Sequence, residues 1–376
     1  MSMFEHQDVL AAINGMAPLP RKIEIVHDLL KNRFDFIDRI AVAVYDSQTD
    51  LLKTYVQSCS DGSPLSLYDA KLAEAGSLQE ILKVGRPRVV NDLEVFSQAP
   101  AEHSRLIAAK NYRSSYTMPM ILNGEFFGFL FFNSFRKQVF DEMALYHLDL
   151  IGHLLSLMVM HEMSTVRTLV AMVKTVTDMS LRRDPETGAH LQRMSNYSRL
   201  IAKGVAVKFG LSDEMLEHIY RFSILHDIGK ICIPDKILLK PARLDDEEFE
   251  LMRTHTTKGA EIVDKMLENM NLVDFPHAAT LRNITMYHHE AVDGSGYHGL
   301  AGAEIPIEAK IVAVADVFDA LTSVRPYKEA WSNDRAIEYL QSLSGTKFDV
   351  DCVVAMIECR EQVEEIQKQF CEDELG

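Results

Sequence analysis

The chain has 376 residues, 47% of them hydrophobic and 25% charged, which is enough for two domains with separate cores. Its formal net charge of −16 argues against broad binding to DNA, RNA or anionic membranes, since that binding depends on clustered lysine and arginine. No apolar run approaches the roughly 20 residues that cross a bilayer. Five scattered cysteines without a C-x-x-C pair indicate a reduced, cytoplasmic protein.

The first 145 residues mix helices with strands. An apolar stripe predicts a helix over residues 20–33. The pair Asn123-Gly124 tolerates positive φ and is a strong hairpin signal between two strands. We therefore expect residues 1–145 to form an antiparallel sheet with flanking helices, an α+β domain. The expected strands are residues 39–45, 51–58, 116–122 and 125–133.

This arrangement resembles a GAF domain, a small-ligand sensor module, over about residues 20–155. The resemblance rests on residues 112–120, on residues 123–130, and on Phe140 with the helix after it. It implies a bound cyclic nucleotide, haem, bilin or other small ligand, or none, and no motif chooses among these. A purely structural or dimerising role is an equal alternative.

Residues 141–183 contain one glycine and no proline, so they predict one long helix. We interpret residues 146–183 as a signalling helix that pairs with its copy in a homodimer. The alternative is a long helix packed on its own domain. The apolar seam expected to form the dimer is Leu148, Leu155, Val159, Met163, Val166, Val170 and Val173.

From Asp184 onward the pattern is helical almost throughout, which predicts an all-α bundle over residues 184–376. Helices are expected near residues 187–209, 212–229, 246–254, 256–270, 276–290, 307–322, 333–343 and 349–368.

Histidines and carboxylates are concentrated in this second half. The adjacent pairs His226-Asp227 and His288-His289 can ligate one metal ion or serve two, and Asp316 lies in an apolar run where an unpaired carboxylate is costly. A single histidine is usually a core or surface residue, but the joint pattern indicates a metal centre. Imidazole with carboxylate suits iron, manganese or zinc. The candidate ligands are Glu186, His190, His226, Asp227, His255, His288, His289 and Asp316.

The second half resembles the HD-GYP branch of the HD phosphohydrolase superfamily over about residues 165–365. The matching stretches are residues 184–190 with Arg193, residues 225–230, 233–244, His255 with Gly259, residues 288–297, 305–306, 313–323 and 325–327.

The resemblance implies a helical bundle that hydrolyses cyclic dinucleotides, chiefly cyclic di-GMP to linear pGpG, with a further cut to GMP left open. It implies two or three divalent ions, most commonly iron or manganese, on the eight ligands above, with Glu186 providing for the third. Catalytic roles fall on Asp227, Lys230 and Asp184, with Asp293 as an alternative to Asp184. Substrate contacts fall on Arg193, Lys230, Arg325 and Lys328.

One departure from the family pattern concerns the loop 296–298, which reads Gly-Tyr-His in place of Gly-Tyr-Pro. Loss of the proline changes the stiffness of the loop and keeps cyclic GMP-AMP open as the substrate. His298 is either an extra ligand or a loop residue. Two further alternatives are a receptor that binds without turnover and a nucleotide phosphohydrolase, and residues 288–297 disfavour the second.

Overall fold

The computed structural model describes residues 8–15, 17–60, 65–96, 110–180, 188–323 and 329–371. Contacts divide the chain into an N-terminal unit, residues 1–165, and a C-terminal unit, residues 166–376. The division falls inside helix α4 (Glu142–Ser180). The domain limits expected after residues 145 and 183 lie on either side of this division and stay predictions.

The N-terminal unit is built on an antiparallel sheet whose strands follow the order β3-β2-β1-β6-β5-β4. The expected hairpin is confirmed, because Asn123 and Gly124 join β5 to β6 with φ values of 53° and 83°. The short strands β3 and β4 at the two edges were not expected. The strands are β1 (Arg39–Asp46), β2 (Leu51–Cys59), β3 (Asp69–Lys71), β4 (Arg88–Val90), β5 (Ser114–Leu122) and β6 (Glu125–Ser134).

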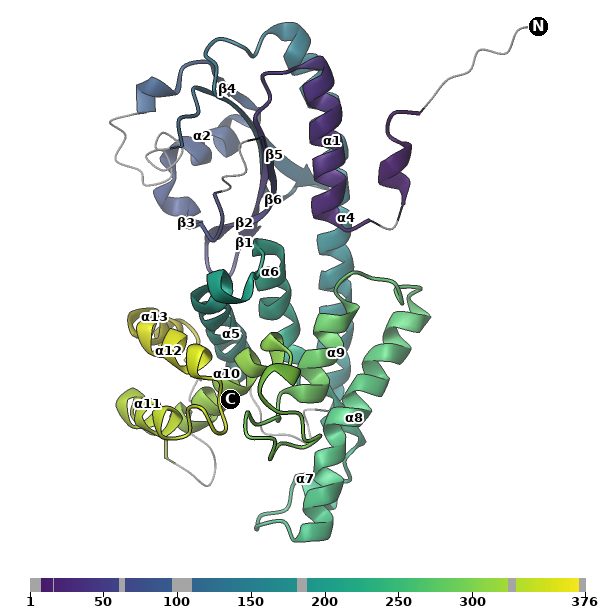
Figure 1. The fold of residues 1–376 in the computed structure, drawn as a ribbon, viewed down its shortest axis with the longest axis vertical. Helices are drawn as coiled ribbons and strands as arrows, with labels where there is room; N and C mark the ends of the chain where they lie inside the picture. Colours follow the sequence, from purple (N-terminus) through teal and green to yellow (C-terminus); the bar gives the residue numbers. More distant parts are fainter. Residues whose placement is uncertain are drawn as a thin grey trace, which may run out of the picture. The chain divides into compact units, whose positions relative to one another are not determined.

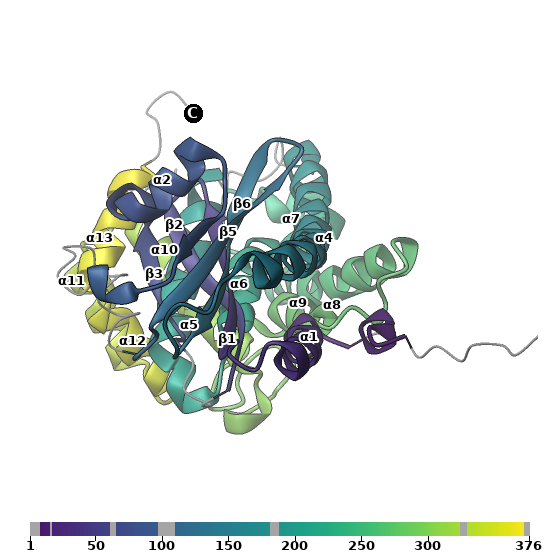
Figure 2. The same ribbon diagram turned by 90° about the horizontal axis from the view of Figure 1, so that it is seen from above.

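Helices cover both faces of this sheet (Figures 1 and 2). Helices α1 (Leu19–Arg33) and α4 share a large apolar core with one face, whereas α2 (Gly76–Val84) packs on the other. Short 3-10 turns complete the unit. The expected α+β class, an antiparallel sheet with flanking helices, is confirmed. The 3-10 turns are η1 (Ala11–Asn14), η2 (Leu72–Glu74) and η3 (Leu93–Phe96).

The apolar seam predicted on α4 does not face outward. Leu148, Leu155, Val159 and Met163 are buried in the core of the N-terminal unit, so for these residues the predicted dimer face was wrong. The sheet is a nearer apolar partner than a second chain, and periodicity alone does not distinguish the two. The side chain of Val173 lies outside the described residues.

A different stripe of α4 is exposed. Met143, Tyr146, Leu150 and Leu157 are 64%, 66%, 59% and 53% exposed. Their spacings of three, four and seven residues place them along one side of the helix. The long helix therefore carries two apolar stripes, one packed on its own sheet and one uncovered.

Helix α4 also has the length and composition of a membrane span over residues 142–172. The stretch is not a continuous apolar run, because charged and polar residues such as Asp149 and Glu162 interrupt it. Leu148, Leu155 and Met160 from this stretch lie in the apolar core of the N-terminal unit, as expected of a core helix in a globular domain. The cytoplasmic location stays a prediction.

The C-terminal unit consists of helices and 3-10 turns in the part of the chain that the structure describes (Figure 1). The helices are α5 (Gly188–Phe209), α6 (Asp213–Phe222), α7 (Asp235–Leu238), α8 (Asp246–Asn269), α9 (Ala278–Tyr287), α10 (Ile307–Thr322), α11 (Asn333–Ser342), α12 (Val350–Glu358) and α13 (Arg360–Gln369). The 3-10 turns are η4 (Ser223–Leu225), η5 (Ile228–Cys232) and η6 (Gly302–Glu304).

Four of the predicted helices differ from those in the structure. The helix expected over 212–229 ends at Phe222 and continues as the turns η4 and η5. The two helices expected on either side of His255 are one helix, α8, which starts at a capping box formed by Asp245 and Glu248. The helix expected over 349–368 is interrupted at Cys359. The first difference matters most, because it places His226 and Asp227 on a tight turn.

Candidate metal centre

The predicted ligands come together from several separate elements of the C-terminal unit. His190 lies on α5, His255 on α8 and Asp316 on α10. His226 and Asp227 join η4 to η5. His288 is the residue that ends α9, and His289 follows it.

A close approach of two backbones places Asp227 beside His255. Gly229 in turn η5 packs directly on helix α8, and a Cβ at this position would collide with the carbonyl of His255 and the amide of Gly259. Glycine is therefore required where η5 meets α8. Asp227 is the residue that precedes η5, so this packing places its carboxylate beside His255.

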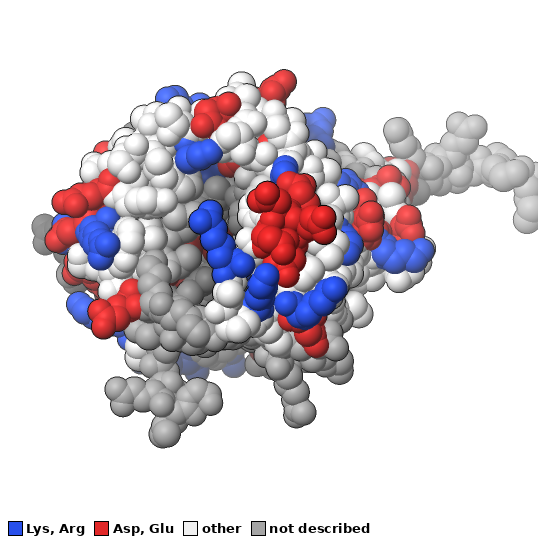
Figure 3. Space-filling view, turned by 90° about the horizontal axis from the view of Figure 1, so that it is seen from below, with Lys and Arg blue, Asp and Glu red and all other residues white. Residues whose placement is uncertain are grey.

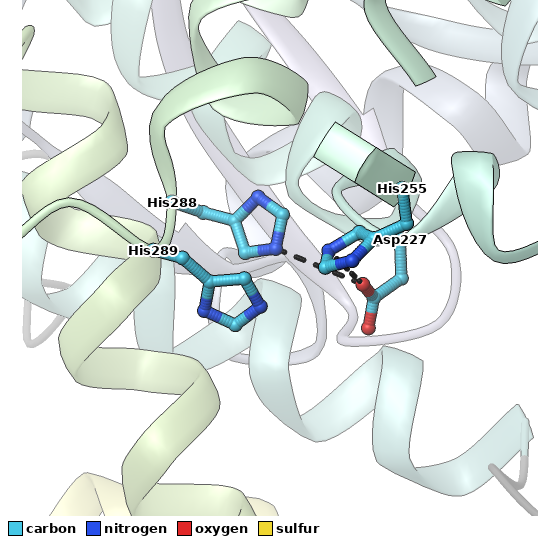
Figure 4. Close-up of side chains that lie close together, drawn as sticks. All are labelled: Asp227, His255, His288 and His289. Atoms are coloured by element: carbon cyan, nitrogen blue, oxygen red, sulfur yellow. Dashed lines mark ion pairs between the residues drawn. The ribbon is translucent and has the colours of Figure 1, made fainter. Parts of the chain in front are cut away.

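Asp227 directs its two carboxylate oxygens to different partners. Its Oδ1 lies 3.2 Å from Nε2 of His255 and 3.7 Å from Nε2 of His288 (Figure 4). Its Oδ2 lies 3.0 Å from Nε2 of His226 and 2.8 Å from Nζ of Lys230. One carboxylate thus contacts histidines on two sides.

The candidate ligands fall into two groups, in each of which the ligand atoms lie within 4.8 Å of one another. His226 belongs to the second group, and its Nε2 is 3.9 Å from Oδ1 of Asp316. Asp227 belongs to the first group but also touches His226, so it connects the two. The first group is Asp227, His255, His288 and His289, and the second is His190, His226 and Asp316.

The hydrogen bonds of the histidines define which nitrogen can bind a metal. Nδ1 of His226, His255 and His288 lies 2.8, 2.8 and 3.0 Å from the backbone carbonyls of Ser223, Met252 and Ile284. A carbonyl only accepts, so each Nδ1 carries the proton and each neutral Nε2 presents a lone pair. These three Nε2 atoms lie near the carboxylate of Asp227.

Several of these atoms are buried without a hydrogen bond in the described part of the chain. They include Nε2 of His255 and His288 and Oδ1 of Asp227. Buried polar atoms are rarely left without a hydrogen bond. Metal ligands are an exception, because a metal ion takes the place of the hydrogen-bond partner. The donors therefore fit divalent transition-metal ions, which favour imidazole together with carboxylate.

The protonation states also suit metal binding. Burial lowers the pKa of His288 and holds that of His289 well below its usual range. Burial alone would raise the pKa of Asp227, but the charge of Lys230 and the contact with His226 outweigh it and hold this pKa well below normal. Neutral imidazoles and an ionised carboxylate are the forms that ligate.

A family model described as HD domain matches residues 175–352. These residues are an HD domain. Relatives of this part include a cyclic di-GMP phosphodiesterase response regulator of Xanthomonas campestris pv. campestris. It is 46% identical over 189 residues, which are 50% of this chain and 47% of that protein.

A 3'3'-cGAMP-specific phosphodiesterase of Vibrio cholerae is 36% identical over 218 residues, 58% of this chain and 39% of that protein. Among solved structures, a GAF domain/HD domain protein from Geobacter sulfurreducens aligns with a TM-score of 0.31 and 15% identity, over 40% of this chain and 96% of that chain. The chain spans about half the length of the curated relatives that it matches.

Asp319 of the HD domain is a site residue that the sequence reasoning missed. It is fully buried, its Oδ2 lies 2.7 Å from Nδ1 of His190, and it accepts a further bond from Ser323. It therefore orients His190. A second carboxylate three residues after Asp316, in the same apolar helix, was the available signal.

Arg193, a predicted substrate contact, makes several hydrogen bonds within the protein. Its guanidinium is buried and donates to both oxygens of Asp319, at 2.7 and 3.0 Å, and to the carbonyl of Phe370 at 3.0 Å. Through Asp319, Arg193 helps to position His190, and its contact with substrate stays a prediction. A buried carboxylate such as that of Asp319 needs a cation beside it.

The loop that carries the Gly-Tyr-His departure is held by Glu290. Its buried carboxylate accepts from the backbone amides of His298 and Leu300, at 2.6 and 2.7 Å. The ring of His298 bonds the hydroxyl of Thr256 at 3.0 Å, which favours its interpretation as a loop residue. The ring of Tyr297 lies 4.7 Å from that of His289, so the loop borders the metal centre.

The remaining predicted residues are placed as follows. Lys230 is ion-paired to Asp227, and its side chain is 22% exposed. Asp293 is hydrogen-bonded to Ser295 on the exposed side of the loop rather than in the cluster. Asp184, Glu186, Arg325 and Lys328 lie outside the described residues.

Asp319→Asn tests the positioning of His190. The amide has one acceptor oxygen in place of two, so Arg193 or His190 loses its partner. We expect metal affinity to fall by about 10- to 100-fold, as for other residues that orient metal ligands. Metal competition titrations on folded protein measure it. Asp334→Asn, in a surface ion pair with Arg360, is the matched control and should change nothing. Unchanged affinity in Asp319→Asn would contradict the positioning role.

The buried histidines also predict a pH dependence of the metal-free protein. The folded pKa values of His288 and His289 lie below 6.5, so below pH 6.5 the unfolded chain binds more protons than the folded one. The free energy of unfolding should therefore fall as the pH drops below about 6.5. Urea unfolding at several pH values measures this fall. A double change of both histidines to asparagine should make it smaller, and an equal slope in the variant would refute the assignment.

Proposed function

We propose that the chain is a metal-dependent phosphodiesterase that hydrolyses cyclic di-GMP to linear pGpG. The reaction either stops at pGpG or continues with a second cut to GMP. The observation that supports this most is the placement of Asp227, whose two oxygens face two groups of histidine and carboxylate ligands. Adjacent metal positions joined by a carboxylate suit phosphodiester hydrolysis. The phosphodiesterase names of the relatives support the same reaction.

The proposed cofactors are two or three divalent ions, most commonly iron or manganese. The two ligand groups in the described residues account for two ions, and Glu186 would serve a third. Bound ions of this kind supply Lewis acidity to a phosphate and lower the pKa of water to near neutrality. Imidazole and carboxylate donors without thiolate are compatible with both metals.

The reaction adds one water across one phosphodiester. The water oxygen forms a bond to phosphorus, the bond from phosphorus to the 3′ oxygen breaks, and a proton ends on that leaving oxygen. Asp227 is kept ionised by Lys230, so it remains a ligand throughout. The partly exposed side chain of Lys230 carries the nearby cation that we assign to charge on the phosphoryl oxygens.

A dianionic substrate needs cations near the metal centre, although the chain is acidic overall. On the surface shown in Figure 3, acidic side chains gather in a patch that lysine and arginine side chains border. The first turn of α8 holds Asp246, Glu247 and Glu248. Near the metal centre, Arg253 lies 5.1 Å from the ring of Tyr297 and bonds its backbone carbonyl. Arg253 and Lys230 are therefore the cations that we assign to the substrate phosphates.

The second candidate substrate is 3',3'-cyclic GMP-AMP. The observation that favours it is the altered loop, in which Glu290 and Thr256 hold His298 at the position of the missing proline. The third candidate function is a receptor that binds a cyclic dinucleotide without turnover. The convergence of the described ligands argues against it, because a receptor has no need of a complete metal centre.

The N-terminal unit is the proposed regulator. A mostly apolar cavity lies against β1 and β2 on the side of the sheet that α2 covers, and its lining includes Arg39, Tyr68, Leu78 and Phe131. A small ligand with an apolar body and one anionic or hydrogen-bonding group would match these residues.

The proposed homodimer uses the exposed stripe of α4. Spacings of three, four and seven suit pairing with a second copy in a coiled coil. Leu150→Glu would place a charge in that seam, so we expect the dimer to dissociate at concentrations where the unaltered protein is paired. Sedimentation velocity measures this. Val207→Glu adds the same charge at an 86% exposed position on α5 and is the control. A variant that sediments like the unaltered protein would exclude this interface.

Turnover tests the enzyme proposal. Anaerobically purified protein, reloaded with iron or manganese, should convert cyclic di-GMP to pGpG, and rates with cyclic GMP-AMP rank the two substrates. Lys230→Met should lower the rate about 100- to 1000-fold, the usual cost of one electrostatic group. Lys208→Met, from a surface ion pair with Asp351, is the control.

Asp227→Ala separates an enzyme from a receptor. Loss of the connecting carboxylate should abolish both metal binding and turnover, because it serves both ligand groups. Metal-replete unaltered protein that binds cyclic di-GMP and never cleaves either dinucleotide would contradict the enzyme proposal and favour the receptor.

A further inference from the structure

A second group of metal-ligand side chains lies elsewhere in the C-terminal unit. Glu214 and His218 are four residues apart on α6, so they project from the same side of that helix. His277 is the residue that precedes α9. One ligand atom from each of these three side chains lies within 4.8 Å of the others.

The contacts within this group are close. Nε2 of His277 is 3.2 Å from Oε1 of Glu214. The rings of His218 and His277 are perpendicular, with centroids 3.5 Å apart. His218 is fully buried and Glu214 is 6% exposed. A carboxylate and two imidazoles that converge out of water are costly to bury unless a positive charge compensates the carboxylate.

Two phenylalanine rings border the histidines of this group. The ring of His218 lies 5.4 Å from that of Phe222 and 6.3 Å from that of Phe275, which also lies 5.4 Å from His277. Aromatic neighbours of this kind limit the access of water to the ligand atoms. Burial, followed by the neighbouring His277, holds the pKa of His218 well below its usual range, so this imidazole stays neutral.

We propose that Glu214, His218 and His277 bind one divalent transition-metal ion of the zinc class. Two imidazoles with one carboxylate are a donor set that zinc accepts, with water or another group in the remaining position. In the described structure, Nε2 of His277 lies beside the Glu214 oxygen, where an ion would take the place of the shared proton.

This site is separate from the centre at Asp227. His277 and His288 stand at opposite ends of α9, eleven residues apart, which is about 16 Å along a helix. Helix α6 likewise runs from Glu214 toward the turn that carries His226. An ion here would tie the start of α6 to the start of α9, the two helices that lead to His226 and His288. The inferred role is therefore structural support for the HD domain, independent of which substrate it takes.

Metal counting on the full-length protein tests the proposal. Metal-free protein is loaded with Zn²⁺, freed of excess by gel filtration and measured by mass spectrometry. Glu214→Gln and His277→Gln keep the size of each side chain and should each hold one zinc fewer per chain than the unaltered protein. The controls are Glu268→Gln, from a surface ion pair with Lys265, and His147→Gln, which bonds the Met143 carbonyl. They should retain the full count.

Equal zinc content in the unaltered protein and both folded variants would overturn the proposal. Should a variant fail to fold, anomalous diffraction at the zinc edge from crystals of the unaltered protein decides the question. A peak among Glu214, His218 and His277 supports the site, and its absence while the Asp227 centre holds zinc overturns it. Neither result depends on turnover of a cyclic dinucleotide, so the two proposals fail separately.

Discussion

The C-terminal unit depends on one constraint: Asp227 must remain ionised while it lies among buried histidines. Burial raises the pKa of a carboxyl group, and here Lys230 and the neighbouring histidines reverse that effect. Turn η5 can hold Asp227 in this position because Gly229 lets the backbone lie directly on α8. The geometry of the centre is therefore coupled to backbone packing as well as to charge.

A second buried carboxylate near the metal centre is also compensated by a positive charge. Asp319 is buried and is compensated by Arg193 while it orients His190. Breaking a buried pair of this kind costs about 3–5 kcal/mol because an uncompensated charge remains. Glu290 fixes the loop at Tyr297, because its carboxylate accepts hydrogen bonds from two backbone amides. These three carboxylates explain how ligands from separate elements keep a common geometry without belonging to one helix.

Much of this could be predicted from the sequence. The Asn123-Gly124 turn and the alternation around it predicted the central hairpin, because residues tolerant of positive φ occur in few other contexts. The His226-Asp227 and His288-His289 pairs predicted a cluster of ligands, since such residues are rarely buried without a function.

Other features depended on tertiary structure. The apolar seam on α4 packs on its own sheet, and periodicity does not say which partner covers a helix. Arg193 was expected at the substrate, and its pairing with the buried Asp319, which joins residues 126 positions apart, was not predicted. The short edge strands β3 and β4 have three residues each, too few for an alternating pattern to stand out.

Electron paramagnetic resonance of the manganese-loaded protein would show directly whether Asp227 joins two metal positions. Two Mn²⁺ ions connected by one carboxylate should give a spectrum of an exchange-coupled pair. Asp227→Asn should convert it to that of isolated ions or abolish binding. A spectrum of isolated Mn²⁺ in the fully loaded, unaltered protein would show that Asp227 does not connect two ions.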